Sequence, residues 1–450
     1  MSIFAVGLAL RLALIARFPV IFGGDPMVRM LHRDRILISH QLPLLQLIIF
    51  TIARATHNYL FTMCVMAVIG AAVGTALYLL ARDLTTEPAA FWAGLLLATN
   101  PFVAGYSIVP FQESLMLAAL LLAFHFFYSE RFAFASICLA LACFTRFEAW
   151  AAAPVLVYAY GRKRGYLRGV ALLGWAPAVW LIYQRGLAPM GSFVLESHVT
   201  FARFLRWVYL AYITAKFTPV IVLALGAGGL WLLWQDRWWP RLWPLIVFIT
   251  LFTVALLFSA HGDFLDPERR IASREAHLWI AAVVLLAAIA LAKMGRYRVP
   301  VALAGVLFGI IGSYRLVSRE ASEPRLELSY RLAKFFDHAL QPGERALILS
   351  PPWPAGTFDF YLQRARETGG EKGYEAAKQN LKEADTSPPD YQRTLIHSRF
   401  DRDRLLWSAD TCTAWLAIWS DYESPLPDPP QTVLQAGGLT VKIGKRACPE

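Results

Sequence analysis

The chain has 450 residues, a formal net charge of +11 at pH 7 and 15 tryptophans. It is 57% hydrophobic with a mean hydropathy of +0.46, which excludes an ordinary soluble protein of this length. The basic residues divide between short loops along the whole first part of the chain and form no single basic face, which argues against a nucleic-acid partner.

Long apolar runs recur from the N-terminus to about residue 315 and then stop. A helix needs about 20 apolar residues to cross a bilayer, so we predict an α-helical polytopic membrane domain over 1–317 with about eleven transmembrane helices. A small soluble α/β domain over 318–450 is expected to follow. The expected spans are 3–22, 60–80, 89–107, 113–128, 132–146, 149–160, 169–186, 211–233, 242–260, 277–292 and 299–315.

Basic residues indicate the orientation of these spans. The strongest clusters lie in alternate short loops, at 162–168, 237–241 and 293–298, and the positive-inside rule assigns such loops to the cytoplasm. We therefore expect an integral protein of the bacterial plasma membrane with a cytoplasmic N-terminus and an extracytoplasmic C-terminal domain. Arg11 and Arg17 lie deep in the first span, so either the true start lies upstream or these arginines are buried and paired.

Acidic residues border several spans on the predicted outer face. The sequence Gly23-Gly24-Asp25-Pro26 follows the first apolar run, Glu113 opens the fourth, and Arg146 and Glu148 separate two others. Ionisable groups at membrane depth are costly and therefore indicate function. The structural alternatives are a turn aspartate at Asp25, a helix N-terminal residue at Glu113, and an ion pair between Arg146 and Glu148 that holds two spans together.

The predicted outer loops also carry arginines that orientation does not require. They snorkel to lipid headgroups, or they form an anion site, because a guanidinium group binds phosphate through two parallel hydrogen bonds. The clustering of three arginines before His277 favours the anion site. The candidate substrate-binding residues are Arg29, Arg146, Glu148, Arg269, Arg270, Arg274 and His277. The outer loops also hold two stretches, Leu42 to Phe50 and 188–210, that we interpret as interfacial helices.

The order of these features resembles the GT-C superfamily of membrane glycosyltransferases, which use polyprenyl-phosphate sugars. The matching features are Asp25 in the first outer loop, Leu42-Pro43-Leu44-Leu45, Asn100-Pro101, Glu113, Thr145-Arg146-Phe147-Glu148, Arg270 and Arg274. The tail resembles the C-terminal domain of protein-mannosyltransferase and aminoarabinose-transferase relatives. The family often has a second acid beside the first, whereas Pro26 follows Asp25 here. A divalent metal stays an open alternative that no acidic pair supports, and no cofactor is assigned.

The resemblance implies transfer of a sugar from a polyprenyl phosphate to a glycan, lipid or protein acceptor on the extracytoplasmic face. Asp25 is then the candidate general base, and Glu113 orients the acceptor or shares that role. Arg270 and Arg274 would hold the leaving phosphate. The alternative from another class is a transporter or flippase of a lipid-linked or anionic substrate, although no internal hydropathy repeat is evident. A polymerase or ligase of lipid-linked glycans would share the donor.

The polar tail predicts helices at 324–340 and 371–384, strands at 345–349 and 413–419, and a hairpin over 431–443 that turns at Gly437-Gly438. Its two cysteines, Cys412 and Cys448, are expected to form a disulfide in an oxidising compartment; the alternative is two unpaired thiols. The three other cysteines of the chain fall in apolar spans and are expected to stay reduced.

Overall fold

The structure is a computed structural model, and it describes two long stretches and a few strands. The stretches are 2–187, with gaps at 20, 23–25, 27–28, 31–32, 34–35, 37–41 and 57–58, and 201–322, with gaps at 236–238 and 259–275. Beyond them it describes residues 328, 331–332 and 335 and the strands at 346–349, 415–419, 432–436 and 439–445. The chain divides into two compact units. One comprises Met1–Val20 with Arg33–Ser318, and the other Ile21–His32 with Arg319–Glu450.

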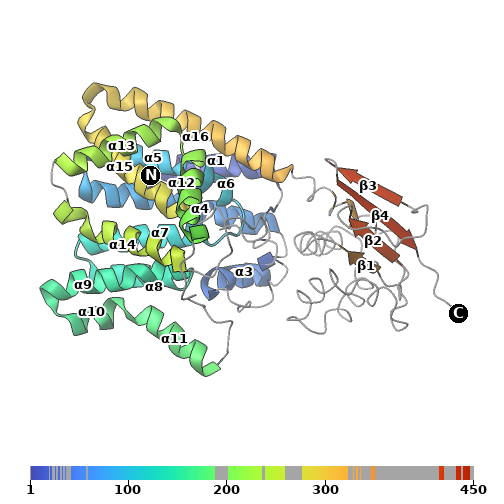
Figure 1. Cartoon of the computed structure of the whole chain (residues 1–450), viewed down its shortest axis with the longest axis horizontal. Helices are drawn as coiled ribbons and strands as arrows, with labels where there is room; N and C mark the ends of the chain where they lie inside the picture. The colour runs from blue at the N-terminus through green and yellow to red at the C-terminus, as the bar shows by residue number, and fades with distance from the viewer. Residues whose placement is uncertain are drawn as a thin grey trace. The chain divides into compact units, whose positions relative to one another are not determined.

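The core of the first unit is a set of closely packed apolar helices (Figure 1). They are α1 (Ser2–Arg17), α4 (Tyr59–Leu84), α5 (Glu87–Ala98) and α7 (Glu113–Tyr128). Small residues set the close spacing of α4 and α5, because a Cβ atom at Gly74 would lie 2.7 Å from the Gly94 carbonyl oxygen. This packing of small residues is typical of helices in membranes, where apolar burial alone does not drive association.

Two short helices lie between these core helices in the sequence. Helix α3 (Pro43–Ala55) begins with a proline at its first position, where the missing N–H costs nothing, and confirms the helix predicted in this loop. Helix α6 (Pro101–Tyr106) continues after α5. The span predicted over 89–107 is therefore two helices, separated at Thr99 and Asn100.

Two further predicted spans are also broken, which corrects the sequence-based boundaries. The run at 169–186 is α10 (Tyr166–Leu173) followed by α11 (Trp175–Leu187), with Gly174 between them. The run at 211–233 is the end of α12 (Phe201–Phe217) and the start of α13 (Val220–Gln235), with Pro219 at the junction. Proline ends a helix because it lacks an N–H and clashes with the preceding turn.

The remaining helices complete the first unit. The short predicted pair at 132–146 and 149–160 is α8 (Phe132–Cys143), the 3-10 turn η1 (Phe147–Ala151) and α9 (Ala152–Arg164). Then follow α14 (Trp239–Phe258), α15 (Ala276–Lys293), η3 (Gly295–Tyr297) and α16 (Arg298–Ala321). Three described stretches are both long and apolar enough to cross a membrane: α4, α15 and η3 with α16.

The described part of the second unit contains a four-stranded sheet in the order β1-β2-β4-β3. Strand β1 (Ala346–Leu349) is parallel to β2 (Trp415–Trp419), and β4 (Leu439–Lys445) is antiparallel to both β2 and β3 (Thr432–Ala436). Ala436 faces Leu439, which confirms the hairpin predicted around Gly437-Gly438. The predicted helix at 371–384 and both tail cysteines lie outside the described residues.

Candidate functional site

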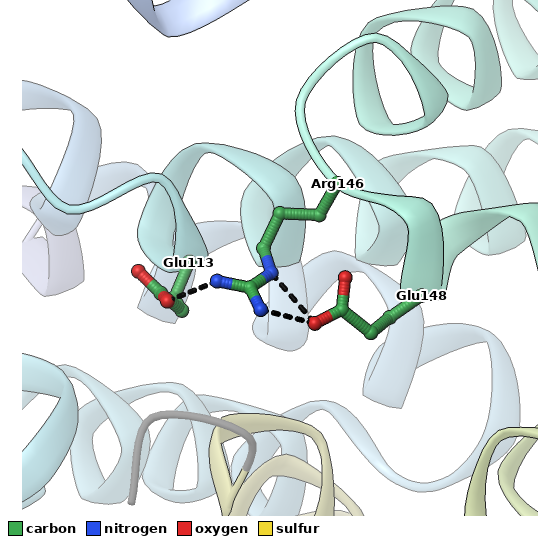
Figure 2. A network of polar contacts seen from close by, with 3 residues as sticks. All are labelled: Glu113, Arg146 and Glu148. Atoms are coloured by element: carbon green, nitrogen blue, oxygen red, sulfur yellow. Dashed lines mark hydrogen bonds and ion pairs between the residues drawn. The ribbon is translucent and has the colours of Figure 1, made fainter. Parts of the chain in front are cut away.

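A buried ion-pair network joins three of the residues that the sequence singled out. The Arg146 guanidinium lies between the carboxylates of Glu113 and Glu148 (Figure 2). Its Nη1 donates to Glu113 Oε1, and its Nε donates to Glu148 Oε1 at 2.8 Å, with Nη2 on the same oxygen. The network thus connects the start of α7 with the link between α8 and η1.

The sequence Thr145-Arg146-Phe147-Glu148 forms this link for local reasons. The Thr145 hydroxyl donates to the Leu141 carbonyl at 2.7 Å and so satisfies one of the last carbonyls of α8. Arg146 is extended, with φ −149° and ψ 146°, and Glu148 lies in the first turn of η1. Because Arg146 is extended and Glu148 lies two residues later in the first turn of η1, their side chains can reach each other.

Glu113 is the first residue of α7, as the helix-terminus interpretation predicts. The positive end of the helix dipole favours a carboxylate at this position. However, its side chain is only 1% exposed and is engaged by Arg146, so it is more than a helix-end charge. With Arg146 at 11% and Glu148 at 17% exposure, two carboxylates share one guanidinium, and the three side chains carry a formal charge of −1.

The backbone around Arg146 is also held by α3. The amide of Leu44 donates to the Phe144 carbonyl at 3.1 Å, and the Trp150 indole donates to the Cys143 carbonyl at 2.9 Å. Leu44 belongs to the proline-led segment that the family resemblance uses. The start of α3 and the end of α8 are thereby tied together directly beside Arg146.

The other candidate residues lie elsewhere in the described part of the chain or outside it. His277 is the second residue of α15, is 1% exposed, and packs its ring 4.6 Å from that of Phe102. Arg29 is buried in the second unit. Asp25, Arg269, Arg270 and Arg274 lie outside the described residues.

The structure also contains two polar arrangements whose partners sequence reasoning did not find. His125 and Asp83, in the last turns of α7 and α4, form a pair at 2.6 Å. Arg11 is fully buried and hydrogen-bonded, mainly to backbone carbonyls. The only sequence signal for either arrangement was a charge or a histidine inside an apolar run. Of the two interpretations offered for Arg11, an upstream start or a buried arginine, the structure agrees with the buried arginine. Arg17, by contrast, is exposed and lies over the Phe18 ring.

Among the described residues, no group of three or more histidine, cysteine, aspartate or glutamate side chains is arranged to hold a metal ion. Glu113 and Glu148 are bridged by a guanidinium group, which occupies the place between them that a divalent cation would need. The carboxylate oxygens of this arrangement are suited to accept hydrogen bonds.

No protein-family model and no curated protein sequence matches the chain. Its structure is similar to that of ArnT, an aminoarabinose transferase, from Cupriavidus metallidurans bound to undecaprenyl phosphate. The TM-score is 0.63 at 15% sequence identity, and the match covers 98% of this chain and 97% of that one. The apo state of ArnT gives a TM-score of 0.57 at 14% identity, and that match covers 80% of this chain and 84% of the ArnT chain. Archaeoglobus fulgidus oligosaccharyltransferase AglB, in complex with an inhibitory peptide and a dolichol-phosphate, gives 0.50 at 14% identity, over 80% of this chain and 63% of that one.

These solved structures belong to GT-C superfamily membrane glycosyltransferases, and this chain shares their fold. At such identities the likeness concerns the fold. Three described stretches are long and apolar enough to cross a membrane, which is typical of an integral membrane protein. The resemblance found in the sequence is therefore confirmed at the level of the fold.

Proposed function

We propose that this protein is a membrane glycosyltransferase that moves a sugar from a polyprenyl-phosphate donor to an acceptor hydroxyl on the extracytoplasmic face. The observation that carries this proposal is the fold shared over nearly the full length of both chains with ArnT, a structure bound to undecaprenyl phosphate. The buried Glu113–Arg146–Glu148 network adds acidic groups at helix ends, where such chemistry needs them.

In the proposed reaction the acceptor oxygen attacks the anomeric carbon of the donor sugar. The bond from that carbon to the phosphate oxygen breaks, and polyprenyl phosphate leaves with the bonding electron pair. Asp25 takes the proton of the acceptor hydroxyl as general base. Glu113, held by Arg146, orients the acceptor or shares the proton.

The phosphate of the donor is proposed to be bound by arginines. Arg270 and Arg274 are proposed to hold the leaving group, with Arg29, Arg269 and His277 contributing to the same anionic substrate. The sequence supports this assignment for Arg269, Arg270 and Arg274, because these three gather directly before the start of α15 and orientation does not require them. The proposed organisation is a transferase domain over 1–317 and an extracytoplasmic domain over 318–450.

Binding of undecaprenyl phosphate to the purified protein, measured by native mass spectrometry, tests the donor class. Arg270→Ala and Arg274→Ala should each weaken binding about tenfold or more, and the lysine variants should recover only part because the planar fork is lost. Arg296→Ala serves as control, since Arg296 is an exposed residue in the link before α16. Equal affinity in all alanine variants would instead indicate that these arginines snorkel to headgroups.

A transporter or flippase remains the rival function. In sealed vesicles with labelled polyprenyl-phosphate sugar, a transporter moves label across the membrane without changing the molecule. A transferase releases polyprenyl phosphate only when an acceptor is present. Label that crosses intact, with no release, would replace the proposed function by transport.

A further inference from the structure

The chain between α5 and α7 lies in the core of the first unit, and its helix is interrupted at Thr99 and Asn100. Its polar backbone groups need partners, because a backbone group without one is costly in an apolar surrounding. The Asn100 side chain accepts from the amides of Phe102 and Val103 and so caps α6. On the other side of the break, the Thr99 carbonyl accepts from the Ser313 hydroxyl at 3.1 Å.

Arg11 of α1 supplies the remaining donors. Its Nη1 donates to the Ala98 carbonyl at 3.0 Å and to the Gly7 carbonyl at 2.8 Å, and its Nη2 donates to the Val103 carbonyl at 3.4 Å. Its Nε donates to the Ser107 hydroxyl at 2.6 Å. One fully buried guanidinium thus holds the end of α5, the middle of α6 and the residue directly after α6.

Helix α4 closes this arrangement at a glycine. A Cβ atom on Gly70 would lie 2.4 Å from the Ser107 hydroxyl oxygen and 2.6 Å from Arg11 Nε. Only a residue without a side chain lets α4 approach the Arg11–Ser107 contact. The contact is therefore enclosed by α1, α4 and the α5–α6 break.

The segment that Arg11 holds leads directly to Glu113. Five residues separate Ser107 from Glu113 in the sequence, and Ile108, Val109 and Phe111 among them are buried. A buried, packed segment transmits the position of one end to the other, because close-packed interiors do not deform freely. An uninterrupted apolar helix would need no charged side chain at this place. Burying Arg11 costs free energy, and we attribute its presence to the backbone geometry that its hydrogen bonds fix.

We propose that Arg11 is a positioning residue: it fixes the α5–α7 connection and, through it, the carboxylate of Glu113 against Arg146. The kinetic part of this inference rests on the proposed glycosyltransferase function. The structural part does not, because it concerns the backbone between residues 99 and 112 whatever the substrate is.

Hydrogen–deuterium exchange of the purified protein tests the structural part. Arg11→Met keeps the bulk of the side chain and removes all four donated hydrogen bonds, so amides in 99–112 should exchange about tenfold faster or more. Arg11→Lys should give an intermediate rate, because an ammonium group reaches fewer of these acceptors. Arg17→Met is the matched control on the same helix, since Arg17 is exposed, and should leave this segment unchanged.

Kinetics of donor turnover test the positioning role. Arg11→Met should lower kcat about tenfold or more with the donor KM within about twofold, and Arg11→Lys should recover part of the loss. Ser107→Ala is the gentler variant and decides the matter if Arg11→Met does not fold; it should raise exchange in 99–112 and lower kcat in the same direction. Gly70→Ala should have the same effect from the side of α4.

Unchanged exchange in 99–112 for both Arg11→Met and Ser107→Ala would overturn the inference. So would a kcat per folded molecule equal to that of the unaltered protein, because a purely structural residue lowers only yield and melting temperature. If the unaltered protein releases no polyprenyl phosphate at all, the proposed function fails, and the exchange measurement alone decides on the role of Arg11.

Discussion

Arg146 illustrates how environment decides the value of an ion pair. It lies between two carboxylates and is 11% exposed, and Glu113 is 1% exposed. Arg164 and Glu130 also form an ion pair, with an N–O distance of 2.8 Å, but their side chains are 48% and 58% exposed. An exposed pair contributes about 0–1 kcal/mol, whereas removing one partner of a buried pair costs about 3–5 kcal/mol.

We expect Arg146→Met to destabilise the protein strongly, because it removes the cation shared by the buried Glu113 and the partly buried Glu148. The loss should be about 3–5 kcal/mol, read as a lowered melting temperature in detergent. The double variant with Glu113→Gln should lose less than the sum of the two single losses, because one of the uncompensated charges is then absent.

Arg164→Met is the matched control and should change stability by no more than about 1 kcal/mol. Additive losses in the Arg146 and Glu113 pair would show that the two side chains do not interact. In that case Glu113 acts only as a helix-terminal residue, and its contact with Arg146 does not support a role in catalysis.

Sequence reasoning found the members of this network and offered the ion pair between Arg146 and Glu148, which the structure contains, but it did not find the contact of Arg146 with Glu113. Glu113, Arg146 and Glu148 were visible because each is a charge beside an apolar run. That Glu113 shares Arg146 with Glu148 depends on how α7 packs against α8, which no local pattern specifies. The partners of Arg11 were still less visible, because three of them are backbone carbonyls and carry no sequence signature.

At the scale of elements, glycine positions determine how closely two helices can pack. In α13 and α15, a Cβ atom at Gly226 would meet Val283 at 2.8 Å, and one at Gly229 would meet the Leu286 carbonyl oxygen at 1.9 Å. Both contacts advance in the same direction along the two helices, so α13 and α15 run parallel. Their backbones approach too closely for any side chain at Gly229.

Gly229→Ala should therefore separate α13 from α15. Overpacking of this kind costs about 1–3 kcal/mol, and a contact with backbone leaves little room for adjustment. The measurement is the melting temperature in detergent, with Gly228→Ala as control, because a Cβ there meets only Ala290 at 3.9 Å. Equal melting temperatures for the two variants would contradict the described packing of α13 on α15.

The same scale shows where the prediction of elements from sequence stopped. Long apolar runs such as α4 and α15 were located within a few residues, because hydropathy alone defines them. The breaks at Gly174 and Pro219 were missed, since apolar residues continue on both sides and hide the interruption. Asn100-Pro101 was noted only as a feature shared with the family, and the short helix α6 that begins there was not predicted.

At the scale of the whole molecule, orientation in the membrane is a prediction from the basic loops alone. A reporter fused after Glu450 should be active only outside the cytoplasm, and one fused at Arg164 only inside. The reason is the alternation of basic clusters at 162–168, 237–241 and 293–298. The opposite pattern at either position would rule out the eleven-span arrangement and the extracytoplasmic tail.

Release of free polyprenyl phosphate is the measurement that tests the central proposal most directly. The purified protein in lipid nanodiscs is given labelled undecaprenyl-phosphate sugars and a set of glycan, lipid and peptide acceptors. The proposal predicts acceptor-dependent release, reduced about 100- to 10,000-fold by Asp25→Asn, which removes the general base while leaving donor binding largely intact. Release at the unaltered rate in Asp25→Asn, or no release with any donor while undecaprenyl phosphate binds, would contradict it.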